Sequence, residues 1–242
     1  MDFQLSTEQR ELQNLVREIA QQQIKPLASS WDRSHEFPWE SIRALANAGI
    51  LGLTIPEQYG GAGGSWFEAV LAIEEVARAC YQTAMAVLGE LGVQTQVIVH
   101  YGTDAQKERY LPAIARGELI CAICMTEPDA GSDVGAIQTR AEAVDGGYVL
   151  NGSKVLISRA DVAGIFVTFV RFGNAPGSRG VGAVLIERDT PGLEIGPGDE
   201  TLGGEQLFPV YFRDLRVPEE AVLVKQHGFR KLMSAFNGQR CL

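Results

Sequence analysis

The stretch CAICMTEPDAGSD, residues 121–133, decides how this chain is organised. It begins with a Cys-x-x-Cys spacing, which is typical of redox dithiols and of half a zinc site, and continues as a polar turn. Thr126 follows the apolar run directly, and Pro128 blocks further strand pairing because proline has no backbone N–H. The Gly131–Ser132 corner frees backbone N–H groups. We therefore expect a strand and then a turn that suits polar atoms of a flat ring or a phosphate.

Cys121 and Cys124 are predicted to be small buried residues of that strand. A zinc site would need two further ligands, but Cys80 and Cys241 are isolated and the three histidines show no ligand spacing. A redox dithiol is expected at the start of a helix that follows a strand, whereas these cysteines lie inside an apolar run. We expect no metal.

Helix signals repeat before residue 118. Three capping boxes predict helix starts: Ser6 with Gln9, Ser65 with Glu68, and Thr103 with Gln106. The first helix should bury one apolar face, made of Leu12, Leu15, Val16, Ile19 and Ala20. Pro26 is predicted to help stop this helix, and Pro38 and Gly49 to bound a short second one. A glycine-rich loop, PEQYGGAGGS, comes next, and the second box opens a long apolar-rich stretch to about Glu90.

Short apolar segments separated by Gly and Pro predict strands after residue 118. They are ICAICM, two runs within 138–158 that join at Asp145-Gly146-Gly147, and the segments 164–172, 180–188 and 207–217. Helical character returns in 227–242. The expected fold class is α+β: an all-α N-terminal domain over 1–117, a β-sheet or barrel domain over 118–224, and the first helix of a truncated C-terminal helical domain over 225–242.

Composition excludes several classes of function. The net charge of −9 divides almost evenly between the two halves, so the concentrated basic face that nucleic acid requires is not expected. No apolar run approaches the roughly 18 residues of a membrane span. The four cysteines form no regular framework, and with no apolar leader visible we expect a cytoplasmic protein. The glycine clusters complete neither G-x-G-x-x-G nor G-x-x-x-x-G-K, which disfavours Rossmann and P-loop sites.

Six segments in this order resemble the acyl-CoA dehydrogenase family. They are LSTEQRELQNLVREIAQQQIKPLA, GILGLTIPEQYGGAGGS, YGTDAQKERYLPAIARGE, MTEPDAGSD, LNGSKVLIS and LRVPEEAVL. Members of that family are FAD enzymes with an N-terminal helical domain, a middle β-domain and a C-terminal four-helix bundle. The resemblance implies the same architecture here.

The resemblance also implies a set of site residues. Main-chain and hydroxyl groups of Met125 and Thr126 should contact the pyrimidine side of the isoalloxazine ring, and the Ser158 hydroxyl should face flavin N5. Leu156 stands where the family carries an aromatic residue that packs beside the flavin. The expected cofactor contacts are Ile123, Cys124, Met125, Thr126, Gly131, Ser132, Leu156, Ile157 and Ser158. The expected acyl-CoA contacts are Ser132, Asn237 and Arg240.

The implied reaction is FAD-dependent α,β-dehydrogenation of an acyl-CoA or acyl-carrier thioester, in fatty acid metabolism. The family's catalytic carboxylate lies in the C-terminal bundle, so we expect the base beyond Leu242 and residues 1–242 alone to be inactive. Glu127 is the carboxylate inside the motif, but its place before Pro128 in a tight turn favours a role in fixing the loop.

The expected partners are electron-transfer flavoprotein and further copies of the complete chain, as a homodimer or homotetramer. Two enzymatic alternatives keep the flavin: an acyl-CoA oxidase and a flavin monooxygenase on the same scaffold. A third alternative is a non-catalytic subunit that a partner chain completes.

Overall fold

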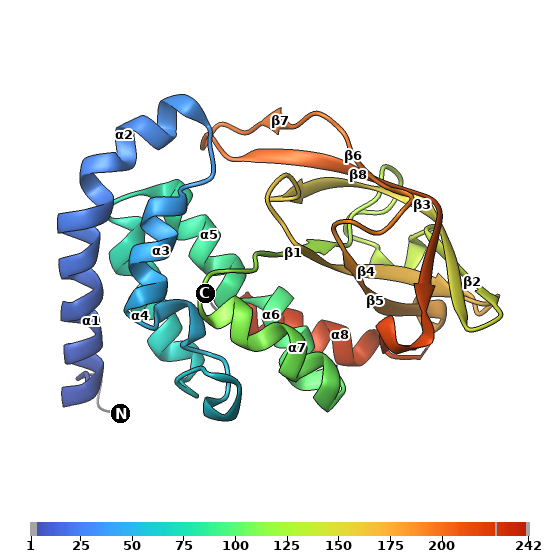
Figure 1. The fold of residues 1–242 in the computed structure, drawn as a ribbon, viewed down its shortest axis with the longest axis horizontal. Helices are drawn as coiled ribbons and strands as arrows, with labels where there is room; N and C mark the ends of the chain where they lie inside the picture. The colour runs from blue at the N-terminus through green and yellow to red at the C-terminus, as the bar shows by residue number, and fades with distance from the viewer. Residues whose placement is uncertain (1–3, 226, 241–242) are drawn as a thin grey trace.

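The computed structural model describes residues 4–225 and 227–240 and divides them into a helical part and a sheet (Figure 1). Helices α1 to α7 gather on one side of the molecule, and α8, which follows the sheet, returns to lie beside α6. The fold is α+β, as predicted. The helices are α1 Thr7–Ile19, α2 Lys25–Ser34, α3 Trp39–Asn47, α4 Trp66–Ala77, α5 Tyr81–Leu91, α6 Val93–Tyr101, α7 Asp104–Ala115 and α8 Phe229–Gln239.

All three predicted capping boxes form, and they begin α1, α4 and α7. The prediction that Pro26 ends the first helix is wrong. A π-helical turn, Ala20–Ile24, joins α1 to α2, and Pro26 lies in the first turn of α2. Proline has no backbone N–H to donate, and it is tolerated near the start of an α-helical segment, where its fixed φ already suits the helix. Helical structure therefore continues to Ser34.

One further expectation for the helical part needs correction. Leu15 was assigned to the buried face of the first helix, but it is 44% exposed, whereas Val16, Ile19 and Ala20 are buried. The apolar-rich stretch that the second capping box opens contains two helices, α4 and α5, with a short non-helical link between Ala77 and Tyr81. No helix among the described residues is both long and apolar enough to cross a membrane.

The strands form one sheet in the order β6-β8-β3-β2-β4-β5-β9, with β1 added beside β4 and β7 beside β8. β1 and β2 run parallel to β4, and the other pairs are antiparallel. The predicted turn at Asp145–Gly146 joins β2 to β3, whereas the short strands β6, β7 and β9 were not predicted. The strands are β1 Cys121–Cys124, β2 Arg140–Val144, β3 Gly147–Ser158, β4 Ile165–Phe172, β5 Val181–Glu187, β6 Leu193–Ile195, β7 Asp199–Glu200, β8 Gln206–Pro218 and β9 Val222–Val224.

β1 lies where the helical part meets the sheet, and its side chains alternate between two cores. Cys121 and Ile123 pack with α6, α7 and α8, whereas Ala122 and Cys124 pack among the apolar residues on the other face of the sheet. Both cysteines are fully buried with free thiols, as predicted, while Cys241 lies outside the described residues. Burial raises the pKa of Cys121 well above its ordinary value and that of Cys124 to about 12, so both thiols are protonated at neutral pH.

A buried ion pair joins the helical part to the sheet. Glu90 of α5 and Arg159, which directly follows β3, lie 3.4 Å apart, and both side chains are at least nine-tenths buried. Glu90 Oε1 also accepts the backbone N–H of Cys121 at 3.3 Å, so this one carboxyl contacts both sides of the boundary. Burial raises the pKa of Glu90 to about 7, because the loss of hydration outweighs the attraction of Arg159.

Replacing Glu90 with Gln is expected to remove a pH dependence of stability. The folded-state pKa exceeds the ordinary value of 4.5, so the folded chain binds this proton more tightly than the unfolded chain. The stabilisation from the neutral carboxyl is full below pH 4.5 and is lost as the pH rises through about 7. The free energy of unfolding should therefore fall by on the order of 3 kcal/mol as the pH rises across this range.

Urea unfolding at about pH 5 and about pH 8 measures this difference. From about pH 5 to about pH 8 the free energy of unfolding should fall more in the wild type than in Glu90→Gln. The exposed Glu142, replaced by Gln, is the control and should follow the wild type. A Glu90→Gln variant with the wild-type pH dependence would contradict the assignment of this carboxyl.

Candidate functional site

The turn after β1 is closed by its own backbone and by the carboxylate of Glu127. Glu127 and Ala130 exchange two backbone hydrogen bonds, at 3.0 and 3.1 Å. The Glu127 carboxylate accepts the backbone N–H groups of Gln138 at 2.5 Å and Thr139 at 2.9 Å. Glu127 therefore fixes the loop, as the sequence predicted.

The buried side chain of Lys154, on β3, fixes this turn through two polar contacts. Its ammonium group donates to Glu127 Oε1 at 2.9 Å and to the carbonyl oxygen of Met125 at 3.1 Å, and its side chain is fully buried. Burial lowers the pKa of Lys154, and Glu127 opposes this only in part. Burial also acts to raise the pKa of Glu127, but Lys154 and the hydrogen bonds outweigh it and leave that pKa below its ordinary value.

The end of β3 lies beside the same turn. The backbone N–H of Val155 donates to the carbonyl oxygen of Thr126 at 2.9 Å. A bulge then sets two residues of β3, Val155 and Leu156, opposite one residue of β8. Leu156 has a left-handed backbone, with φ of 59°, and its side chain is 58% exposed. This conformation costs a leucine about 1–2 kcal/mol, so packing around the bulge must impose it.

These two segments face one hollow of about 210 Å³ between the helical part and the sheet. Six of the predicted cofactor residues line it: Ile123, Met125, Thr126, Leu156, Ile157 and Ser158. The structure thus brings together two sequence segments about 30 residues apart, as the resemblance implied. Its walls combine apolar side chains with polar ones, which are Gln94, Thr126, Ser158, Arg159, Glu205 and Gln239.

Three predicted cofactor residues do not line this hollow. The Cys124 side chain points into the core on the other face of the sheet, because neighbouring residues of a strand face opposite sides. Gly131 and Ser132 come after the closed turn, and Ser132 instead lines a second hollow with Arg140, Arg171 and residues 173–178. Their contacts with a cofactor or an acyl-CoA stay predictions.

α8 contributes to the hollow through residues other than those predicted. Asn237 and Arg240 do not line it, whereas Phe236 and Gln239 do. Arg240 lies over the Phe236 ring, 5.2 Å from its centroid, and donates to Asn237 Oδ1 at 3.4 Å. Gln239 accepts the backbone N–H of Val93 at 2.7 Å, which fixes α8 against the start of α6.

Sequence reasoning missed the residues that close the hollow from the helical side and at the end of β3. They are Met85, Leu88, Gly89, Val93 and Gln94, together with Arg159 and Glu205. The spacing of Met85, Leu88 and Gly89 is that of any buried helix face and carries no separate signal. Arg159 follows Ser158 directly, and a charged residue at the end of an apolar strand was the one usable indication.

The hollow suits a flat aromatic cofactor on two grounds. Thr126 and Ser158 line it from different segments, and neither hydroxyl makes a hydrogen bond to another residue that the structure describes. Apolar side chains such as Ile123 and Leu156 supply the surface that a ring requires. The donor set therefore fits the polar edge of a flavin. Among the described residues, no group of three His, Cys, Asp or Glu side chains could hold a metal ion.

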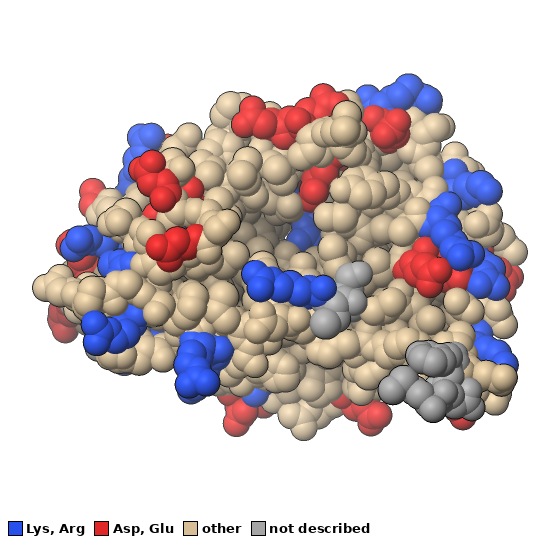
Figure 2. All heavy atoms as spheres, turned by 180° about the vertical axis from the view of Figure 1, so that it is seen from behind, with Lys and Arg blue, Asp and Glu red and all other residues tan. Residues whose placement is uncertain are grey.

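The surface charges are mixed on the face that Figure 2 shows. Figure 2 shows the face opposite to that of Figure 1, which is hollowed near its middle with a basic group visible inside. Acidic and basic side chains are interspersed around it, without a broad basic area on this face. This face thus lacks the concentrated basic area that a nucleic-acid backbone requires.

Comparison with known proteins gives consistent results over nearly the whole chain. Residues 6–118 match the family described as acyl-CoA dehydrogenase, N-terminal domain, and residues 122–215 match acyl-CoA dehydrogenase, middle domain. The chain is 38% identical over 245 residues to acryloyl-CoA reductase (NADH) of Anaerotignum propionicum, covering 99% of this chain and 62% of that protein.

Solved structures agree. Butyryl-CoA dehydrogenase from Megasphaera elsdenii superposes with a TM-score of 0.93 at 31% identity, covering 99% of this chain and 64% of that one. The FAD complex of PigA superposes with a TM-score of 0.91 at 25% identity, covering 99% and 66%.

The chain thus spans less than two thirds of the length of these relatives, and it matches their helical and middle β-domains throughout. The order of helices, sheet and returning helix, and the two segments at the hollow, agree with the same assignment. On this evidence the chain belongs to the acyl-CoA dehydrogenase family.

Proposed function

We propose that this chain binds FAD and supplies the flavin-facing part of an acyl-CoA dehydrogenase. The observation that carries the proposal is the meeting of Thr126 and Ser158 at one hollow, each with a hydroxyl that makes no hydrogen bond to another described residue. The similarity to an FAD complex and to a butyryl-CoA dehydrogenase supports it.

The polar and apolar residues of the hollow would have different roles in binding and orienting FAD. Thr126 and Ser158 would hydrogen-bond to polar atoms of the ring, and Leu156, Ile123 and Met125 would pack beside it. When bound, FAD supplies the redox chemistry by accepting the substrate's β-hydrogen as hydride. The apolar walls would exclude water and hold the acyl group, which is the main contribution a protein makes to such a reaction.

The α-proton must be removed by a base that can reach the substrate. Glu127 is not that base in this proposal, because its carboxylate is engaged by Lys154 and two backbone N–H groups. Glu205 is the carboxylate that lines the hollow within the described part of the chain, and it lies on the short loop before β8. We assign the base to a group beyond Leu242, so the 242 residues alone should not turn over substrate.

The substrate class in this proposal is an acyl-CoA or acyl-carrier thioester. Electron-transfer flavoprotein is the proposed electron acceptor and a homodimer or homotetramer the proposed assembly. An oxidase or monooxygenase outcome is less well supported, since the similar proteins include an acryloyl-CoA reductase and a butyryl-CoA dehydrogenase.

Exchanging Ser158 for Ala, or Thr126 for Val, is expected to weaken FAD binding by about two- to tenfold each, because one hydrogen bond of about 0.5–1.5 kcal/mol is lost. The absorbance of bound FAD should also shift in the Ser158 variant. Titration of the chain with FAD, followed by absorbance and fluorescence, measures both effects.

Ser153→Ala is the matched control, since Ser153 lies on the same strand and does not line the hollow. It should bind FAD as the wild type does. Wild-type affinity and spectrum in both Thr126→Val and Ser158→Ala would place the flavin elsewhere.

The isolated 242-residue chain should show no acyl-CoA turnover in a dye-coupled assay with FAD present. If it does turn over an acyl-CoA at an ordinary enzymatic rate, the base lies within the chain and our assignment fails. Glu205→Gln would then test the carboxylate at the hollow: loss of that activity would identify Glu205 as the base, since a carboxamide cannot accept the proton.

A further inference from the structure

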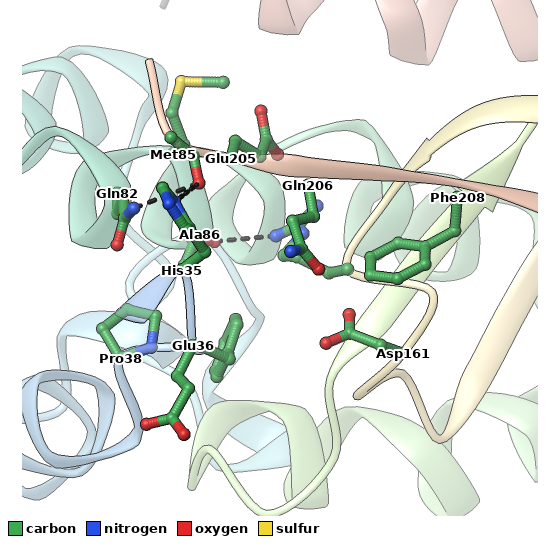
Figure 3. A pocket seen from close by; sticks show the side chains of 13 residues that line it. His35, Glu36, Pro38, Gln82, Met85, Ala86, Asp161, Glu205, Gln206 and Phe208 are labelled. Carbon is green, nitrogen blue, oxygen red and sulfur yellow. Dashed lines mark hydrogen bonds between the residues drawn. The ribbon is translucent and has the colours of Figure 1, made fainter. Parts of the chain in front are cut away.

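The candidate site adjoins a smaller hollow, which is not the one that Ser132 lines, and three residues line both the site and this neighbour. The smaller hollow, of about 40 Å³, lies between the helical part and the start of β8. Figure 3 shows His35 and Gln82 on one side of it and Phe208 and Asp161 on the other. The residues shared with the candidate site are Met85, Arg159 and Glu205. These three therefore form the wall between the two hollows.

Arg159 is held in this wall by buried polar contacts of its two terminal nitrogens, Nη1 and Nη2. Its Nη1 donates to the carbonyl oxygen of Ala86 at 2.9 Å and lies 3.4 Å from Glu90 Oε1. The Gln94 amide completes the set when its oxygen faces Arg159 Nη2, at 2.5 Å, and its nitrogen faces the carbonyl oxygen of Gly89, at 2.9 Å. A side chain with these contacts cannot swing aside without leaving buried polar groups unpaired.

Two features of the backbone place the guanidinium there. Arg159 has a left-handed conformation, with φ of 61°, which turns its side chain from the end of β3 toward α5. Gly89 provides the space, because a Cβ atom at that position would lie 1.7 Å from Arg159 Nη1. Any side chain at residue 89 would therefore displace the guanidinium, so these two residues depend on each other.

We infer that Arg159 is a specificity-determining residue that ends the acyl part of the hollow and restricts the substrate to short acyl groups. The inference rests on the proposed function. Met85, Leu88 and Val93 give the hollow its apolar helical side, which suits an alkyl chain, and the guanidinium lies against Gly89 on that side. A longer chain would have to displace a buried cation from its partners, which is costly in an apolar setting.

The test compares butyryl-CoA with decanoyl-CoA, by calorimetric titration of the FAD-saturated chain. Arg159→Ala alone would leave the Glu90 carboxyl buried without its partner, so the test variant is the double replacement Arg159→Ala with Glu90→Gln. Glu90→Gln alone is the matched control, because it keeps the guanidinium in place. Far-ultraviolet circular dichroism checks that each variant is folded.

The wild type and the Glu90→Gln control should bind butyryl-CoA more tightly than decanoyl-CoA. The double variant should shift the ratio of the two dissociation constants by about tenfold or more toward decanoyl-CoA, since the two hollows become continuous and added methylenes can be buried. If the folded double variant keeps the wild-type ratio of the two dissociation constants, the inference about Arg159 is overturned, but the proposed function is not.

The wild type provides a test that needs no variant. If it binds decanoyl-CoA at least as tightly as butyryl-CoA, Arg159 does not end the acyl hollow. If neither thioester binds the wild type or the variants, while FAD does bind, the proposed substrate class fails as well. The failure of the inference and the failure of the proposed function are thus distinguishable.

Discussion

The buried contact between Lys154 and Glu127 holds together the two segments on which the site depends. Through its second bond, to the carbonyl oxygen of Met125, Lys154 also sets the backbone where β1 becomes the turn. Breaking such a buried pair by removing one partner typically costs about 3–5 kcal/mol, because the other charge is left uncompensated. The positions of Thr126 and Ser158 relative to each other therefore follow from a contact that itself lies outside the hollow.

A second buried pair, Glu90 with Arg159, sets how the helical part sits against this scaffold. Glu90 contacts Arg159 and the backbone of Cys121, so α5, the end of β3 and the start of β1 meet at one carboxyl. The two pairs bracket the last residues of β3: the Lys154–Glu127 pair lies before them, and the Arg159–Glu90 pair lies directly after Ser158. Between them the bulge at Leu156 is held in a conformation that a free chain would avoid.

The sequence predicted what local chemistry determines. The capping boxes specified three helix starts, because each is complete within four residues, and the short apolar segments separated by Gly and Pro specified the principal strands. The continuation of helix through Pro26 and the exposure of Leu15 depend on packing that no local pattern records. Likewise the motif residues could be assigned to one site through the family resemblance. Arg159 could not be assigned in this way, because its partners Glu90 and Gln94 lie about 65 residues or more away in the sequence and only the fold brings them together.

The central claim is that the segments at the ends of β1 and β3 form one flavin-binding surface. Amide hydrogen exchange of the chain with and without FAD tests it most directly. The account predicts that FAD slows exchange in residues 123–126 and 155–159 together, while residues 173–178, which line the separate hollow with Ser132, change less. Slowed exchange confined to 173–178, with the two segments unaffected, would contradict it.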